Sequence, residues 1–395
     1  MGTQAGVGLS HQRNPRAAGK QAAERALLAG GIERPDFVFL FASVGYDQQA
    51  LLDSVRQATG RAPLIGCSGE GIIGEGETDE SNFTVGVMAT RSDEIRFLNG
   101  NTAGLMARPR GAGHVVAATI QPHLGDDALA LFAFADGLTF NFDQFNAGLD
   151  ETLQLDRLLP LLGGTAGDNY RMERTYQYCD DAVLTDSVTF ALCSGRARIA
   201  WAVNHGCSPL GSERQVTRSV GNVIHEIDGR PVLDVLREYV SAEQIGDWAK
   251  TFTSIPLGFR APDEMRSYDE YVIRVMTAND AQTGSIRIPS EVATGTPVWI
   301  MRRDPEKIGA GVARLGEELK HLTDGAPLKL VFHFDCAGRG NVVLREQQKT
   351  EHLQYLQRTL GQNVPWIGFY TYGELGPVGL KNCFHNWTAV LAAIY

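Results

Sequence analysis

The stretch DFVFLFAS, at residues 36–43, is an apolar run flanked by Pro35 and Gly45. Two similar runs follow it, ALALFAFAD at 128–136 and LKLVFHFDC at 328–336. Apolar runs without regular polar alternation predict strands that are buried on both faces, as in sheets covered by helices. The three runs therefore favour an α/β fold with mixed α+β character.

Each run begins the same succession of a strand, a helix and a second strand that ends in a glycine-rich turn. The helices are expected at 47–59, 142–159 and 342–360, and the second strands at 63–68, 161–169 and 366–371. A carboxylate follows or ends each second strand, at Glu70, Asp168 and Glu374. This period of about 100 residues is too long for a solenoid and indicates duplicated strand–helix–strand modules, although such strands also recur by chance in α/β proteins.

Further segments complete the modules. A helix is expected at 15–28, strands near 82–89 and 94–99, paired strands at 187–194 and 197–204, and a final strand at 387–394. The region from His205 to about Gly325 differs, with β structure at 213–227, a helix at 231–240 and strands near 268–276 and 296–301. We therefore expect two intimately packed domains, residues 1–204 and 205–395.

The composition excludes several classes of protein. The 395 residues are 43% hydrophobic and 21% charged, unlike a disordered or fibrous chain. The net charge of −10 opposes binding to nucleic acids and to anionic membranes. No apolar stretch approaches the roughly 18 residues that span a bilayer, and the first residues lack the apolar segment of a secretion signal. We expect a cytoplasmic protein without a membrane or nucleic-acid partner.

Metal-ligand spacing is not found in the sequence. The six cysteines form no C-x-x-C pair, and the nine histidines form no H-E-x-x-H or H-x-H motif. His205, His225, His333 and His385 lie at or in expected strands, where a buried imidazole needs a partner. A satisfied core histidine explains such positions more often than a ligand does, so we expect no metal site.

The segment GCSGEG at 66–71 could project Cys67 or Ser68 from the junction of a strand and a turn. Its spacing is not that of the G-x-S-x-G nucleophile elbow. The glycines alternatively serve positive φ angles or the close approach of a backbone or a ligand.

The segment GGTAGDN at 163–169 could bring backbone donors to an anion, but it matches neither the dinucleotide motif nor the phosphate loop. Asp168 and Asn169 either close an Asx-type turn or meet a ligand.

The segment FDCAGRG at 334–340 places Cys336 at a strand end and Arg339 between two glycines. Ligands of open α/β sheets bind at the carboxyl ends of the strands, where an arginine can hold a carboxylate with two hydrogen bonds. A salt bridge from Arg339 to Glu374 or Asp335 is the structural alternative.

The ordered set PLIGCSGEG, GGTAGDN, HGCSPLG, VTRSVGNVIHEIDGRPVLDVLREY, FDCAGRG, GFYTYGELGP and FHNWT resembles the FIST family of bacterial signal-transduction sensors, over nearly the whole chain. The resemblance implies an N-terminal and a C-terminal FIST domain and a non-enzymatic module that binds a small ligand. Amino acids and related metabolites are the ligands proposed for the family. It also implies a separate signalling partner, such as a histidine kinase or a cyclic-nucleotide enzyme.

Some members of the family are haem-binding nitric oxide sensors that regulate a partner histidine kinase, so haem is an alternative ligand. Those members favour a G-C-T-T-A-G-E-like first glycine motif, whereas this chain has GCSGEG. If haem binds, His205 or His385 is the expected axial ligand.

We expect the ligand to lie between the modules, lined by the turns that carry Cys67, Ser68, Glu70, Asp168, Asn169, Cys336, Arg339, Tyr372, Glu374, His385 and Asn386. The competing class is a hydrolase or transferase that uses Cys67 or Cys336 with His205 or His385. A thiol and an imidazole within hydrogen-bond reach beside an oxyanion site would favour that enzyme.

Overall fold

Three modules with the same order of elements form the body of the protein in the computed structural model, which describes residues 2–241, 243–244, 255–263 and 269–395. Module 1 contains β1 (Thr3–Ser10), α1 (Pro15–Gly30), β2 (Phe37–Ala42), α2 (Gln48–Ala58), β3 (Leu64–Ser68), β4 (Gly71–Ile73), β5 (Thr78–Asp79) and β6 (Val85–Ser92). Module 2 contains β7 (Ile95–Ala103), α3 (Pro109–Ile120), β8 (Ala128–Ala135), α4 (Phe142–Leu153), β9 (Leu161–Thr165), β10 (Gln177–Cys179), β11 (Ala182–Leu184) and β12 (Ser187–Gly195). Module 3 contains β13 (Ile199–His205), α8 (Pro305–Leu322), β23 (Leu330–Cys336), α9 (Glu346–Leu360), β24 (Trp366–Thr371), β25 (Gly373–Val378), β26 (Lys381–His385) and β27 (Thr388–Ile394).

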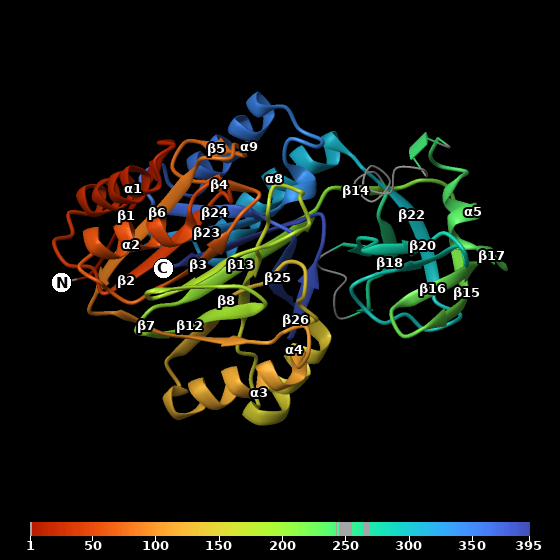
Figure 1. The fold of residues 1–395 in the computed structure, drawn as a ribbon, viewed down its shortest axis with the longest axis horizontal. Helices are drawn as coiled ribbons and strands as arrows, with labels where there is room; N and C mark the ends of the chain where they lie inside the picture. Colours follow the sequence, from red (N-terminus) through yellow and green to blue (C-terminus); the bar gives the residue numbers. More distant parts are fainter. Residues whose placement is uncertain (1, 242, 245–254, 264–268) are drawn as a thin grey trace.

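An inserted domain, residues 207–303, interrupts module 3 between β13 and α8 and forms the lobe at the right of Figure 1. Its elements are β14 (Cys207–Pro209), β15 (Arg214–Val220), β16 (Val223–Ile227), β17 (Arg230–Pro231), α5 (Val232–Leu236), β18 (Leu257–Arg260), β19 (Tyr271–Arg274), β20 (Ala278–Asp280), β21 (Ser285–Arg287) and β22 (Pro297–Arg303). The Asp304 N–H donates to the Gly206 carbonyl over 2.9 Å, so the entry and the exit of the lobe lie together.

In each module, the hairpin that follows β3, β9 or β24 joins the sheet of another module. The three sheets have the orders β1-β6-β2-β3-β10-β11, β7-β12-β8-β9-β25-β26 and β13-β27-β23-β24-β4-β5. The β4–β5 hairpin thus leaves module 1 for the sheet of module 3, β10–β11 leaves module 2 for that of module 1, and β25–β26 leaves module 3 for that of module 2. Each of these sheets therefore contains strands from two modules and is complete only when both modules are present.

A repeated proline–glycine motif sets the parallel strand pair of each sheet. It reads PLIG at 63–66, PLLG at 160–163 and PWIG at 365–368. The carbonyls of Pro63, Pro160 and Pro365 accept hydrogen bonds of 2.8–2.9 Å from the partner strand. A Cβ on the glycine would lie 1.7–2.1 Å from a carbonyl oxygen of β2, β8 or β23, so the strands approach closely only because this residue is glycine.

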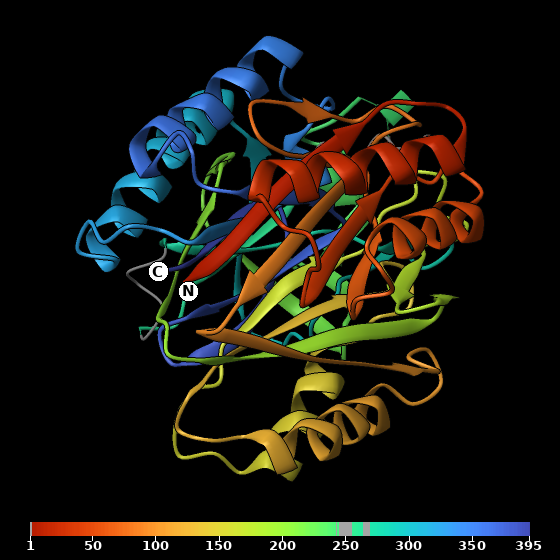
Figure 2. The same cartoon turned by 90° about the vertical axis from the view of Figure 1, so that its left-hand side faces the viewer.

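The centre of the body is built from phenylalanines at alternate positions of β2, β8 and β23. Phe39 of β2 contacts Phe132 and Phe332, with ring centroids 6.0 and 4.8 Å apart. The pairs α1/α2, α3/α4 and α8/α9 cover the outer faces of the three sheets (Figure 2). The strands that end near Ser43, Ser68, Asp136, Thr165, Cys336 and Thr371 are buried along nearly their whole length, which confirms that prediction.

The structure corrects three expected elements. Segments 187–194 and 197–204 are strands but are not paired with each other, because β12 joins β7 and β8 whereas β13 joins β27 in another sheet. The helix expected at 142–159 ends at Leu153, since Gln154 takes a left-handed conformation with φ of 47°. The helix expected at 231–240 is the short α5. No helix in the described ranges is long and apolar enough to cross a bilayer.

Replacing Gly66 by alanine should destabilise the protein, because the new methyl group collides with the Leu40 carbonyl oxygen, 1.7 Å from the ideal Cβ position. We expect a loss of about 1–3 kcal/mol in the free energy of unfolding, measured by urea denaturation. Gly111→Ala is the matched control, because its Cβ would meet only the Arg108 Cβ, at an ordinary 3.5 Å, and alanine favours a helix. Equal midpoints for the two variants would contradict the close-approach argument.

Candidate functional site

The three glycine-rich turns meet at one end of the sheets. The Gly167 N–H donates to the Ser68 carbonyl over 3.1 Å, and the Tyr372 N–H donates to the Thr165 carbonyl over 3.1 Å. The Glu70 N–H donates to the Tyr370 carbonyl over 2.9 Å, which completes a ring of hydrogen bonds among the three turns. The turns therefore cluster, as the sequence repeat predicts.

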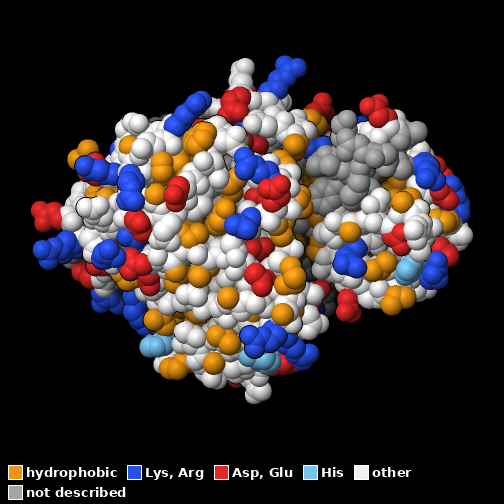
Figure 3. Space-filling view, viewed as in Figure 1, with side chains coloured by type: hydrophobic (Ala, Val, Ile, Leu, Met, Phe, Trp, Pro, Cys, Tyr) orange, Lys and Arg blue, Asp and Glu red, His pale blue; other side chains and the backbone are white. Residues whose placement is uncertain are grey.

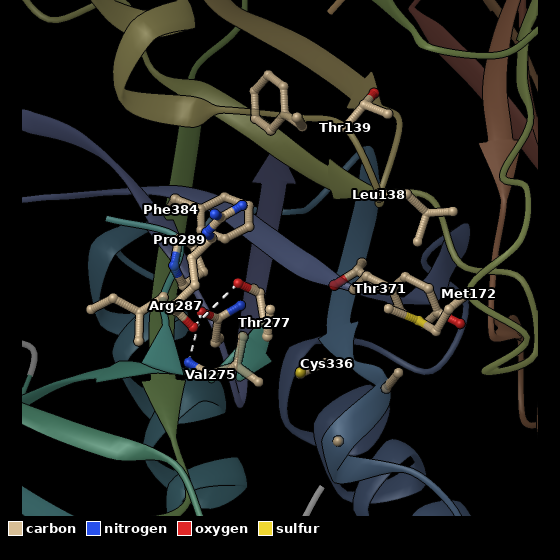
Figure 4. A pocket seen from close by; sticks show the side chains of 18 of the residues that line it. Leu138, Thr139, Met172, Val275, Thr277, Arg287, Pro289, Cys336, Thr371 and Phe384 are labelled. Carbon is tan, nitrogen blue, oxygen red and sulfur yellow. Dashed lines mark hydrogen bonds between the residues drawn. The ribbon is translucent and has the colours of Figure 1, made fainter. Parts of the chain in front are cut away.

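A pocket of about 420 Å³ opens beside this cluster, between modules 2 and 3 and the inserted domain. Its body-side wall comes from the loop after β8 (137–141), from Tyr170 and Met172, and from the turn after β23 (336–338). Its other wall comes from the inserted domain and includes Thr277 and Arg287. Figure 4 shows Leu138, Met172, Thr371 and Cys336 facing Phe384, Pro289 and Arg287 across the space, and Figure 3 shows the lobe that carries Arg287 and Pro289 beside the body.

Cys336, Tyr372 and Asn386 are the expected site residues that line the pocket. The other expected residues lie behind or beside its described wall: Cys67, Ser68, Glu70, Asp168, Asn169, Arg339, Glu374 and His385. Cys67 faces the phenylalanine core, and the Ser68 hydroxyl donates to the Gly167 carbonyl over 2.7 Å. The structure thus brings the turns together but directs many of their polar groups to each other.

Cys336, in the pocket wall, shares a buried hydrogen bond with Glu374, which does not line the pocket. The Thr371 hydroxyl also donates to Glu374, over 2.5 Å, and the Thr388 N–H donates to its second oxygen over 3.2 Å. Burial raises the pKa of Glu374 and of the Cys336 thiol well above their ordinary values. Burial therefore favours the neutral form of both groups.

Asp168 organises the loop that carries Tyr170 and Met172 to the pocket. Its carboxylate accepts the N–H groups of Met172, Glu173 and Arg174 over 2.7–3.0 Å. The Tyr372 hydroxyl donates to it as well, over 2.6 Å. The sequence left open whether Asp168 closes an Asx-type turn or meets a ligand, and in the structure it closes the turn. Asn169 adopts a left-handed φ of 59° beside it and bonds to Asn82.

Glu70 joins this loop to the first turn. The Tyr170 N–H donates to its carboxyl over 3.1 Å, and Tyr372 forms a second hydrogen bond with it. Only 5% of the residue is exposed. Burial raises the pKa of Glu70 to about 7, the two hydrogen bonds oppose the rise, and the nearby Asp168 charge adds to it.

Arg339 forms the ion pair that was the alternative to ligand contact. Its Nε donates to Asp335 over 2.6 Å, and its side chain is 1% exposed. Among the described residues, its two terminal nitrogens have no hydrogen-bond partner and it does not line the pocket. The flanking glycines instead make room for other side chains, since Trp387 packs against Gly338 and the Glu80 carboxylate packs against Gly340.

The two histidines proposed as haem ligands do not fit that role. The Nδ1 atom of His205 accepts the Cys207 N–H over 3.1 Å, and its Nε2 lies 3.1 Å from the Asp269 carboxylate. His385 bonds through Nε2 to the Gly376 carbonyl over 2.8 Å, and burial lowers its pKa to about 3. Neither belongs to the described lining of the pocket, and no metal-binding group of three His, Cys, Asp or Glu residues occurs in the described part of the chain.

Several lining residues escaped the sequence analysis. Trp387 directly follows Asn386 in the FHNWT motif, so proximity to an expected site residue was a usable signal. Phe384, another lining residue, lies two positions before Asn386 in the same motif. Asn222 lies in the motif VTRSVGNVIHEIDGRPVLDVLREY but was not singled out. Arg287, Thr277 and Pro289 belong to no motif and reach the pocket only through the tertiary fold.

The ion pair predicts that Arg339→Ala destabilises the protein, because Asp335 is left buried without its cation. We expect a loss of about 3–5 kcal/mol in thermal or urea unfolding. Arg302→Ala removes a cation that is 59% exposed and should change stability little. An unchanged unfolding midpoint for Arg339→Ala would contradict the structural role.

The position of Glu70 predicts a pH-dependent stability. The folded protein keeps a proton on Glu70 up to about pH 7, whereas the unfolded chain releases it near the ordinary pKa of 4.5. The stability contributed by this group therefore falls as the pH rises from about 4.5 to 7. Relative to Glu70→Gln, the wild type should lose roughly 3 kcal/mol across that window in urea unfolding. Glu173→Gln, exposed on the neighbouring loop, should keep the wild-type profile. A wild-type profile in Glu70→Gln would refute this assignment.

Comparison with known proteins places these features in a family. The FIST N domain model matches residues 36–230 and the FIST C domain model matches residues 233–377. An uncharacterised Mycobacterium tuberculosis protein is 27% identical over 98% of both chains, and one from Methanocaldococcus jannaschii is 24% identical over 68% of this chain and 54% of its own length.

Among solved structures, a chorismatase aligns with 9% identity and a TM-score of 0.37 over 100% of this chain and 99% of its own. A cyanuric acid hydrolase from A. caulinodans aligns with 10% identity and a TM-score of 0.34 over 99% of both chains. Neither likeness is close enough to carry an argument. The two family models together match residues 36–230 and 233–377, which is most of the chain, and the chain belongs to the FIST family.

Proposed function

We propose that this protein is a sensor that binds a small ligand in the pocket between modules 2 and 3 and the inserted domain, and that it signals to a separate protein. FIST domains are associated with signal-transduction sensors. The observation that carries the proposal is the composition of the pocket wall, since Cys336 and Thr371 belong to the body whereas Thr277 and Arg287 belong to the inserted lobe. A ligand that contacts both parts stabilises one arrangement of them over others.

The size of the pocket suits this role. Pockets for small molecules occupy roughly 300–1,000 Å³ and are mainly apolar with a few polar groups. At about 420 Å³ the pocket accommodates an amino acid or a related metabolite. Its lining combines apolar side chains such as Leu138 and Ile288 with polar ones such as Asn222.

Contacts at the edge of the pocket connect it to the inserted lobe. The Val275 N–H donates to Asn386 over 3.3 Å, and Arg274 donates to the Phe384 carbonyl over 3.1 Å. Nearby, Lys307 lies 3.4 Å from Asp269, whose carboxylate also faces His205. These contacts offer a route by which occupancy of the pocket alters the position of the lobe.

Two alternatives receive less support. A thiol-dependent hydrolase or transferase needs an accessible thiolate, but burial raises the pKa of Cys67 and of Cys336 well above the ordinary value. A haem sensor needs an axial ligand that faces a cavity, but the expected imidazoles of His205 and His385 face protein groups. Both observations favour reversible binding of a ligand other than haem.

A tryptophan at position 138 should fill the pocket, because Leu138 forms part of its wall (Figure 4). We expect native mass spectrometry of the protein, purified rapidly from its own host, to detect a bound small molecule that Leu138→Trp lacks. Leu138→Met keeps the side-chain volume and should retain the molecule. The same bound mass in all three proteins, or none in the wild type, would contradict the proposed site.

A further inference from the structure

We propose that the ligand of this pocket is a planar aromatic compound with an anionic group, such as an aryl carboxylate, and without a free amino group. This inference rests on the proposed function and specifies its ligand class. It departs from the amino acids that the family resemblance suggests.

The aromatic part of the ligand is inferred from the pocket wall. The aromatic side chains that line it are Phe140, Tyr170, Tyr372, Phe384 and Trp387. Tyr170 and Tyr372 lie together, with ring centroids 5.9 Å apart, and Phe140 and Phe384 form a second pair at 6.3 Å. Offset and edge-to-face packing against such rings favours a flat aromatic body over a flexible aliphatic one.

The charge of the ligand is inferred from the ionisable groups in the wall. Arg287 contributes a guanidinium, and the described lining contains no Asp or Glu. Glu374 does not line the pocket, and burial raises its pKa and so favours its neutral form. A carboxylate in the pocket thus has a cationic partner, whereas an ammonium group has no carboxylate to pair with.

Hydrogen-bond donors in the wall point to the same class. The guanidinium nitrogens of Arg287 donate but do not accept, so the ligand has to supply acceptors there. Two other polar wall groups are already engaged, since Asn386 accepts the Val275 N–H and the Thr277 hydroxyl donates to the Arg287 carbonyl. The Thr139 hydroxyl has no hydrogen-bond partner among the described residues.

The backbone at Trp387, in the pocket wall, takes an unusual conformation. Its φ of 60° lies in the left-handed region, which bulky side chains rarely adopt. Its N–H contacts the Cys336 sulfur, and the Arg303 guanidinium lies 4.7 Å from the indole ring. Such strain persists only where surrounding contacts hold it, and it gathers at sites that bind ligands.

Four probes with the same aromatic ring test the ligand class: phenylacetate, phenylacetamide, phenethylamine and phenylalanine. Isothermal titration of the full chain should show phenylacetate binding at least about tenfold more tightly than the uncharged amide, because the guanidinium contact is charge-assisted. Phenethylamine and phenylalanine should bind more weakly than phenylacetate. Equal affinities for acid and amide, or tighter binding of either amine, would overturn the inference.

Variants test the residues. Arg287→Gln should lower phenylacetate affinity about tenfold and leave phenylacetamide unchanged, while Arg302→Gln, a matched change outside the lining, should alter neither. Wild-type phenylacetate affinity in Arg287→Gln would refute the anchoring role of the arginine.

The outcome also separates this inference from the proposed function. If none of the four probes binds but Leu138→Trp still loses a molecule that the wild type retains, the aromatic-anion assignment fails and the sensor site stands. If Leu138→Trp retains that molecule, the proposed site itself fails.

Discussion

The phenylalanines of β2, β8 and β23 pack on one another across the centre of the body, and the rest of the structure depends on that contact. Rings such as Phe39 and Phe332 are fully buried only when all three sheets close around them. The exchanged hairpins provide that closure, because each extends a sheet to which its own module does not otherwise belong. The carboxyl ends of the parallel strands then converge, and the glycine-rich turns form their ring of hydrogen bonds.

The pocket lies where the three modules stop being equivalent. After β5, Glu80 fills the junction beside the turn that follows β23, accepting the Asn341 N–H and pairing with the buried Lys349. After β26, the corresponding residue is Asn386, which lies at the pocket that the inserted lobe helps to enclose. A protein side chain thus occupies one junction, whereas another retains a cavity between two parts of the molecule.

Much of the body could be predicted from sequence because its signals are local. The apolar runs lie within one or two residues of β2, β8 and β23, and the recurrent turns do meet. Strand pairing was not readable, since β13 and the exchanged hairpins choose partners far away in the chain. The repeated P-x-x-G motif is a further local signal, because it recurs where the parallel strands of each sheet approach closely.

The site was harder to predict than the fold. Arg339 looked accessible between glycines, yet Asp335, four residues earlier, pairs with it beneath the surface. Asp168 and Ser68 satisfy backbone groups of neighbouring turns. Arg287 carries no sequence signal, because its place in the wall depends on how the inserted lobe rests on the body.

The hairpin exchange has a consequence for folding during synthesis on the ribosome. Thr165 at the end of β9 contacts Gly373 of β25, 208 residues later in the chain. While the intervening segment is being translated, one edge of the second sheet has no strand to cover it, and such edges promote aggregation. The nascent chain is therefore vulnerable until β25 has been translated, and a molecular chaperone that shields strand edges would assist its folding most during that interval.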